Sequence, residues 1–421
     1  MTKTIELLPG VTLRCYPADR FKQGCLSFSL IRPMCAREAA LNALIPAVLL
    51  RGTAKRPDLR AITLKLDDLY GASIGTQVRR VGDYQTLGLY CGFLEDRFAL
   101  PGDRILAPMV DFLREVLLEP VLEKGVFSAA YVESEKKNLI ATIESELNDK
   151  RAYAMGKMLR TMCKADSFGI PRLGDRETVA AITPEAAWNH YRKSLRESRI
   201  DIFYVGSAPA EQVAKLLVPL FDDIERDYVN LPDQTPFHDA GGAHLSERMD
   251  VTQGKLCMGY VTPVTNRDEG FVATQVMNTI FGAGMTSKLF MNVREKMSLC
   301  YAIGSGYYGT KGIVTVSAGI DFDKEQLVRD QVQHQLDALC SGEITDSELL
   351  SAKEALLSSL RGTHDSPGAI EGYYATAALS GMNMTPAAYM DAVRAVTAEQ
   401  VAEAARQLRL HTTYFLKGAA Q

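Results

Sequence analysis

Residues 281–307, which read FGAGMTSKLFMNVREKMSLCYAIGSGY, are the most informative segment of the chain. Its glycines at positions 282 and 284 are typical of a tight turn, because glycine adopts backbone conformations that other residues avoid. No Gly-Lys-Ser/Thr sequence follows these glycines, so a phosphate-binding loop is not expected here. The stretch therefore predicts a turn and a helix, followed by a strand from about Tyr301 onward.

The two halves of the chain repeat the same order of elements. Residues 182–190 and 396–404 each begin a predicted helix, with Thr183 and Thr397 as the N-caps. Equivalent strand-like runs accompany these helices at 200–206 and 412–418, and at 86–93 and 314–321. The offsets stay within roughly 215–230 residues, which indicates duplication of one unit.

We therefore expect an α+β fold with two homologous halves, each an antiparallel-rich sheet with helices packed on one face. The N-terminal half is predicted to span residues 1–225, and the C-terminal half residues 243–421. Residues 226–242 lack periodicity, contain two prolines and end in Gly-Gly, so they are predicted to form a linker.

Composition limits the location and the partners of the chain. The chain has 421 residues, of which 47% are apolar and 23% charged, and a formal net charge of −4. This balance gives no reason to expect nucleic acid or a membrane as a partner. The eight cysteines form no C-x-x-C pair, which suits free thiols in a reducing compartment. We expect a cytoplasmic protein.

A second informative stretch lies at residues 43–53 and reads ALIPAVLLRGT. Its composition predicts a buried apolar helix within residues 36–53 that ends at Gly52. Because proline lacks a backbone N–H, Pro46 is expected to kink this helix or to delay its start.

Together the two stretches resemble the pitrilysin/insulinase family of inverted-motif zinc peptidases. In that family the counterpart of residues 43–53 carries H-x-x-E-H and runs into Lys/Arg-Gly-Thr. Two histidines four residues apart share a helix face and bind zinc, and the glutamate between them activates water. Here Ala43, Pro46 and Ala47 stand at these positions. The resemblance covers most of the chain, weakly over 1–225 and well over 245–365.

The resemblance also places a third zinc ligand on a distant helix, at the second of two glutamates separated by seven residues. Glu135 aligns with the first glutamate, and Thr142 stands at the ligand position. Gly75 and Thr76 replace an Asn-Ala pair that contacts substrate in catalytic relatives. The resemblance therefore implies a degenerate, non-catalytic member with no metal site and no cofactor.

The six histidines are the other residues that could bind a metal. No two of them lie three or four residues apart, so they offer no helical pair for a metal. They stand at positions His190, His238, His244, His334, His364 and His411. A peptidase with ligands foreign to the family remains an alternative.

Residues 281–307 match the family pattern almost throughout. In catalytic relatives the arginine of Arg-Glu-Lys and the tyrosine seven residues later reach the zinc site of the other half. There they hold substrate carbonyls and stabilise the tetrahedral intermediate. The resemblance assigns these roles to Arg294 and Tyr301. Taken alone, an Arg-Glu-Lys run is more often a solvated helix face, and a strand tyrosine is more often packing.

The leading hypothesis is an inactive subunit that forms a heterodimer with an H-x-x-E-H peptidase, in which only the partner holds zinc. It would supply Arg294 and Tyr301 and help enclose a peptide or unfolded polypeptide bound as an added strand. One alternative is a scaffold or core subunit without a part in proteolysis. Another is an accessory factor, since a similar bacterial group is associated by name with modification of elongation factor P.

Overall fold

The computed structural model describes residues 2–146 and 148–418, which form two compact units. Unit 1 comprises residues 1–144, 170–233 and 364–376, apart from the undescribed first residue. Unit 2 comprises residues 145–169, 234–363 and 377–421, as far as they are described. Each unit thus includes one segment from the opposite half of the sequence. No helix in the described ranges is long and apolar enough to cross a bilayer.

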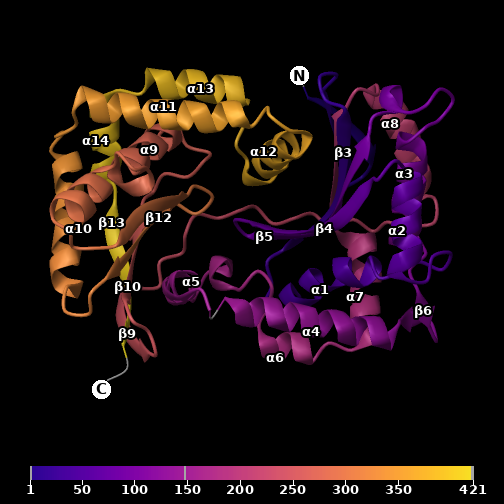
Figure 1. Ribbon diagram of the computed structural model, residues 1–421, viewed down its shortest axis with the longest axis horizontal. Coiled ribbons are helices and arrows are strands. Elements are labelled where there is room, and N and C mark those ends of the chain that lie inside the picture. The colour runs from indigo at the N-terminus through magenta and orange to yellow at the C-terminus, as the bar shows by residue number, and fades with distance from the viewer. Residues whose placement is uncertain (1, 147, 419–421) are drawn as a thin grey trace. The chain divides into compact units, whose positions relative to one another are not determined.

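Unit 1 is built on a six-stranded sheet with the order β1-β2-β8-β3-β5-β4 (Figure 1). Neighbouring strands are antiparallel except β2 and β8, which run parallel. The strands are β1 (Lys3–Leu8), β2 (Val11–Pro17), β3 (Gln23–Pro33), β4 (Ser73–Val81), β5 (Tyr84–Leu94) and β8 (Arg199–Gly206). A separate hairpin pairs β6 (Leu122–Glu123) with β7 (Val126–Phe127).

Unit 2 is built on a five-stranded sheet with the order β11-β12-β10-β13-β9. Its strands are β9 (Ala243–Met249), β10 (Gly254–Val261), β11 (Ala302–Tyr308), β12 (Ile313–Ile320) and β13 (Arg409–Gly418). Only β13 and β9 are parallel, which matches β8 and β2 of unit 1. Strands β2-β8-β3-β5-β4 of the first sheet correspond in order to β9-β13-β10-β12-β11 of the second. Equivalent neighbours are parallel or antiparallel in the same way, so the predicted duplication is confirmed.

The helices of unit 1 cover one face of its sheet. Leu26, Phe28 and Leu30 of β3 point into this core, together with Ile200 and Ile202 of β8. The helices of the unit are α1 (Ala39–Leu49), α2 (Leu59–Asp68), α3 (Leu106–Leu118), α4 (Ala129–Ser145), α6 (Arg176–Ala180), α7 (Pro184–Glu197) and α8 (Ala210–Leu217), with short 3-10 turns η1 (Asp96–Phe98) and η3 (Val218–Phe221).

Unit 2 has a similar helical layer, in which α9 packs against α14 and Phe281 packs edge-on against Tyr260 of β10. The helices are α9 (Phe271–Asn278), α10 (Glu325–Cys340), α11 (Asp346–Gly362), α13 (Pro386–Ala395) and α14 (Ala398–Arg406). Two π-helical segments, η4 (Thr279–Ala283) and η5 (Leu289–Lys296), flank the glycine turn.

The opposite face of each sheet carries one helix from the other half of the sequence. In unit 1, Ile370 of α12 (Pro367–Ser380) packs with Cys25, Phe203 and Val205. In unit 2, α5 (Lys150–Met162) packs against β10 and β13, as Figure 1 shows, and the short 3-10 turn η2 (Ser167–Gly169) follows it. The predicted fold class is confirmed, and these two helices add to the predicted helices on one face.

Local sequence explains several boundaries. The side chains of Thr183 and Thr397 accept hydrogen bonds at the N-termini of α7 and α14, as predicted. The apolar helix is shorter than the predicted 36–53, because α1 ends at Leu49. It does not start late, since Ala39 precedes Pro46 and the helix runs through the proline. The chain turns at Gly52, where a β-carbon would lie 2.5 Å from the carbonyl oxygen of Pro57.

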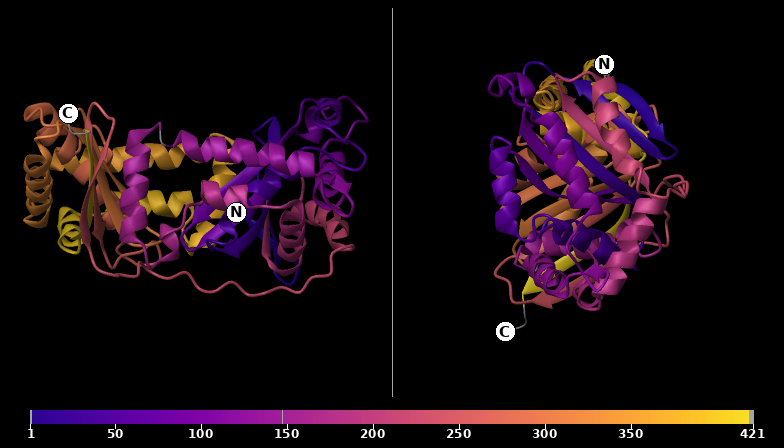
Figure 2. Two further views of the ribbon diagram at one scale, coloured as in Figure 1. Left: turned by 90° about the horizontal axis from the view of Figure 1, so that it is seen from below. Right: turned by 90° about the vertical axis from the view of Figure 1, so that its right-hand side faces the viewer.

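The segment predicted to be a linker, residues 226–242, contains no helix or strand (Figure 2). Its later part is fixed within unit 2 by Lys311, whose side chain is fully buried. The Lys311 ammonium donates to the Thr235 carbonyl at 2.9 Å and lies 3.0 Å from the Asp166 carboxylate. Asp166 also accepts a hydrogen bond from the backbone N–H of His238 at 3.0 Å.

Candidate functional site

The four positions that would carry zinc chemistry lie on α1 and α4. Ala43 and Pro46 are buried within α1, and Ala47 is half-buried. Thr142 is exposed on α4, and its hydroxyl donates to the Asn138 carbonyl at 2.9 Å. Two methyl groups and a pyrrolidine ring have no lone pair to offer a metal, and a neutral threonine is not a typical zinc ligand.

The retained glutamate of α4 has a protein cation as its partner. Glu135 is largely buried, and its carboxylate lies 3.3 Å from the guanidinium of Arg51, which follows α1. Arg51 also donates to the Ser134 hydroxyl at 3.3 Å and lies over the Tyr131 ring. A guanidinium therefore neutralises this carboxylate beside the degenerate helix.

The inner side of α1 is held by a buried polar network. The Asn42 side chain donates to Gln85 at 2.9 Å and lies 2.7 Å from the His190 imidazole of α7. Burial lowers the pKa of His190 to about 4, so this imidazole is neutral near pH 7. The network accounts for a histidine on an apolar face without any metal.

Within residues 2–146 and 148–418, no three His, Cys, Asp or Glu side chains are grouped so that they could hold an ion. The eight cysteines are free thiols, and six of them are buried.

The second predicted site brings its two residues together. Arg294 lies on η5, and its Nε–H donates to the Tyr301 carbonyl at 3.0 Å. The connecting turn contains Ser298, whose φ of +52° is a left-handed value that few non-glycine residues adopt. The Arg294 guanidinium also stacks over the Phe290 ring at 4.5 Å.

Both side chains face open space. Tyr301 is 62% exposed, and the side chain of Arg294 is 37% exposed. The Tyr301 hydroxyl donates to Asp321 at 3.1 Å, and the other oxygen of Asp321 lies 2.6 Å from Lys324. These residues line a pocket of about 330 Å³, and Tyr301 and Asp321 also line a neighbouring pocket of about 580 Å³.

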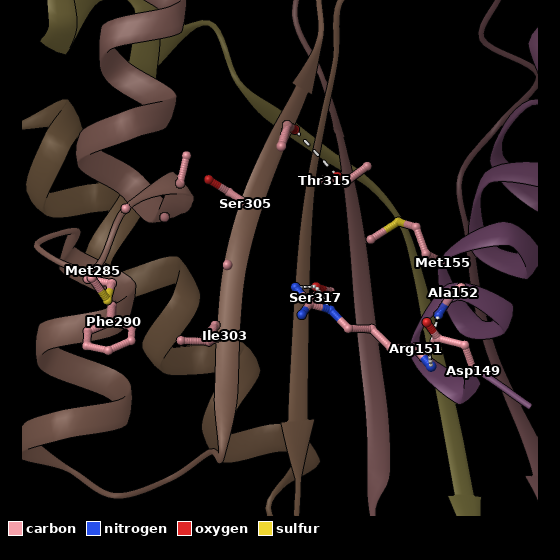
Figure 3. Close-up of a pocket in the computed structure, with 15 residues that line it drawn as sticks. Asp149, Arg151, Ala152, Met155, Met285, Phe290, Ile303, Ser305, Thr315 and Ser317 are labelled. Carbon is pink, nitrogen blue, oxygen red and sulfur yellow. Dashed lines mark hydrogen bonds between the residues drawn. The ribbon is translucent and has the colours of Figure 1, made fainter. Parts of the chain in front are cut away.

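A larger pocket of about 620 Å³ lies at β11, which forms the edge of the unit 2 sheet. Figure 3 shows this pocket between three parts of unit 2: the segment 282–290 with Met285 and Phe290, the strands β11 and β12, and the start of α5. Met285 is 77% exposed, so the rim offers an adaptable apolar side chain. Gly304 and Gly306 of β11 line the pocket without side chains.

Sequence reasoning missed two cations on this sheet face. In Figure 3 the Arg151 side chain reaches from α5 to Ser317 of β12, where its Nε and Nη2 lie 3.2 and 3.1 Å from the hydroxyl. Lys255 of β10 lines the adjoining pocket with Tyr301. No local motif marks either residue, because only the fold brings β10, β12 and α5 together.

The fold and the site together define a class of protein, a duplicated α/β unit of the zinc-peptidase type in which the metal ligands are absent. A family model described as "Peptidase M16 inactive domain" matches residues 181–356. The probable inactive metalloprotease YmfF of Bacillus subtilis (strain 168) is 27% identical over 409 residues, covering 97% of this chain and 96% of that protein.

Two further proteins are similar to this chain. The uncharacterized zinc protease YmxG of the same Bacillus strain is 25% identical over 246 residues, covering 58% of this chain and 59% of that protein. A conserved protein from Enterococcus faecalis V583, known from a crystal structure, is 27% identical in sequence to this chain. The two structures superpose with a TM-score of 0.93, and the match covers 100% of this chain and 99% of that one. The chain is therefore similar to M16 peptidases, and in particular to a domain and a relative that are described as inactive.

Proposed function

We propose that this chain is the inactive subunit of a two-chain peptidase. A homologous H-x-x-E-H subunit would hold zinc, and this chain would supply Arg294 and Tyr301 to the cleavage site. The observation that carries the proposal is the contact between Arg294 and the Tyr301 backbone carbonyl, which keeps these residues together while both side chains stay exposed. A guanidinium and a phenol hydroxyl are donors of the kind that stabilise the oxyanion formed in peptide hydrolysis.

The edge strand β11 supports the peptide-binding part of this proposal. A peptide can add to an open sheet edge through main-chain hydrogen bonds, which tolerate varied sequence. The pocket of about 620 Å³ adjoins this edge, and Tyr301 directly precedes the strand. A peptide bound along β11 would therefore pass close to the Arg294 and Tyr301 pair.

The relatives support a pair of chains. One organism, Bacillus subtilis (strain 168), has both a probable inactive metalloprotease and a zinc protease similar to this chain. We propose that the partner of this chain is a zinc protease of the second kind. The pair would act in the cytoplasm, where the eight free thiols would stay reduced.

The test is kinetic and uses the full chain mixed with an H-x-x-E-H homologue from the same genome. Arg294→Ala should lower kcat for a fluorogenic peptide about 100-fold, because one donor to the transition state is lost. Tyr301→Phe removes only the hydroxyl and should lower kcat in the same direction. Arg361→Ala, which removes an exposed arginine of α11, serves as the matched control.

Complex formation is measured on the same samples by sedimentation. Unchanged turnover in the Arg294→Ala pair would contradict the proposed role. A variant that weakens the complex without changing kcat of the assembled pair would instead support the scaffold hypothesis.

A further inference from the structure

Arg151 and Lys255 place two positive charges on the same face of the unit 2 sheet. The guanidinium of Arg151 is held by a neutral group, the Ser317 hydroxyl. Lys255 pairs in register with Gly319, and Ser317 lies two residues before that glycine on the same face of β12. Lys255 likewise donates to a neutral group, the side-chain oxygen of Gln253.

Gly304 keeps the sheet open beside Arg151. A β-carbon at Gly304 would lie 3.9 Å from Nη2 of Arg151, and one at Gly319 would lie 3.6 Å from Nζ of Lys255. Gly304 faces Ser317 across the β11–β12 pair. The absence of a side chain at Gly304 leaves room for a ligand group next to Arg151, in the pocket of about 620 Å³. At Gly319 the side chain of Gln253 takes up the space, since its Oε1 would lie 2.7 Å from a β-carbon, and Lys255 lines the pocket of about 580 Å³ together with Gln253.

The charges around this face favour an anion. Burial lowers the pKa of Lys255, and the nearby Arg151 lowers it further, whereas Asp149 acts in the opposite direction. Asp149 caps α5 and accepts hydrogen bonds from the backbone N–H groups of Arg151 and Ala152. Asp321 is already bound by Lys324 and Tyr301. Lys150 and Asp250 complete the charged lining of the second pocket.

We infer that Arg151 and Lys255 bind a carboxylate of the peptide that lies along β11, so the subunit selects peptides with an anionic group near Tyr301. This inference rests on the proposed function and names its substrate class. The carboxylate is either an aspartate or glutamate side chain or the C-terminal carboxyl group. Arginine suits this role because its planar fork donates to both oxygens of a carboxylate.

Direct binding to the purified full chain tests the inference without any catalytic partner. The probe is a short fluorescein-labelled peptide of Ala, Ser, Val and Leu with a single Glu, measured by fluorescence anisotropy. It is made with Glu or Gln and with a free or amidated C-terminus. Removing the carboxylate that binds should raise Kd at least about tenfold, as expected for charge-assisted hydrogen bonds.

Variants of the chain separate charge recognition from folding. Arg151→Gln and Lys255→Gln should each weaken binding of the carboxylate peptide, whereas Arg361→Gln should not. Lys255→Glu should weaken binding of the Glu peptide and improve binding of the same peptide with Lys in its place. This charge exchange cannot result from misfolding, because the variant then binds a different peptide better.

Each outcome decides the inference. Sensitivity to Glu→Gln identifies a side-chain carboxylate, and sensitivity to amidation identifies the C-terminus; both support the inference. Equal affinity for all four peptides, or no binding of any, overturns it. A different result would contradict the proposed function alone: peptides bind as described, but Arg294→Ala leaves the turnover of the mixed subunits unchanged.

Discussion

The carboxylate of Glu371 joins α12 to the unit 1 sheet, and its removal gives a quantitative test of that packing. Glu371 is 1% exposed and receives two parallel hydrogen bonds from Arg79 of β4, at 3.1 and 2.7 Å. The buried Ser27 hydroxyl donates to the same carboxylate at 2.8 Å. Gln77 approaches it at 3.5 Å. All four residues belong to unit 1.

The expected cost of Glu371→Ala follows from these contacts. Breaking a buried ion pair by removing one partner costs about 3–5 kcal/mol. The Arg79 side chain is 29% exposed, so water can solvate the remaining charge and the ion-pair part falls to about 2 kcal/mol. The Ser27 hydroxyl loses its acceptor, which adds about 1 kcal/mol. We expect unit 1 to lose about 3 kcal/mol of unfolding free energy.

The assay is urea unfolding followed by tryptophan fluorescence. Trp188 is the single tryptophan of the chain and packs edge-on against Phe127 in unit 1, so its signal reports on that unit. Glu144→Ala is the control, because it removes an exposed partner of Arg176 and should change stability by less than about 0.5 kcal/mol. Replacing both Arg79 and Glu371 by Met should cost less than Glu371→Ala. A loss below about 1 kcal/mol for Glu371→Ala would show that this ion pair does not hold α12 on the sheet.

Three further predictions concern the buried groups and the lost metal site. Burial lowers the pKa of His190 to about 4, so the unfolded imidazole takes up its proton first, near its ordinary pKa of about 6.5. The unfolding free energy should therefore fall by roughly 2–3 kcal/mol as pH drops between these values, and this loss should be smaller in His190→Gln. Lys311→Met leaves Asp166 buried without its cation and should lower the unfolding free energy of unit 2 by about 3 kcal/mol. Faster hydrogen exchange of the backbone amides over residues 234–238 measures this loss. Chelation with EDTA should leave the melting temperature unchanged, because Ala43 and Ala47 cannot bind zinc; one tightly bound zinc per chain by mass spectrometry would contradict this.

Much of the fold could be predicted because it depends on local sequence. Thr183 and Thr397 marked equivalent helices, since a hydroxyl N-cap acts within one turn of its own helix. The exchange of α5 and α12 between the halves could not be predicted. Their packing depends on contacts distant in sequence, such as Ile370 with Phe203, and no local pattern records these. The structure ends α1 at Leu49, before the predicted end at Gly52, and the chain then turns at Gly52 close to the Pro57 carbonyl.

Part of the candidate site could also be predicted from sequence, and part could not. The resemblance of residues 281–307 to the family pattern predicted Arg294 and Tyr301 as a pair, and the structure places the Arg294 guanidinium in contact with the Tyr301 carbonyl. Their role in cleavage stays a prediction. Arg151 and Lys255 carry no motif, because the face that they share exists only after β10, β12 and α5 have packed together. Predicting such a site requires the register of the sheet in addition to its elements.

The central claim is that this chain has no peptidase activity of its own and completes the site of a zinc-bearing homologue. The most direct measurement is hydrolysis of a fluorogenic peptide by the purified chain, by an H-x-x-E-H homologue from the same genome, and by their mixture, with zinc determined on each sample. We predict no activity and no zinc in the chain alone, and activity in the mixture well above that of the homologue alone. Zinc-dependent hydrolysis by the chain alone, or a mixture no more active than the homologue, would contradict the claim.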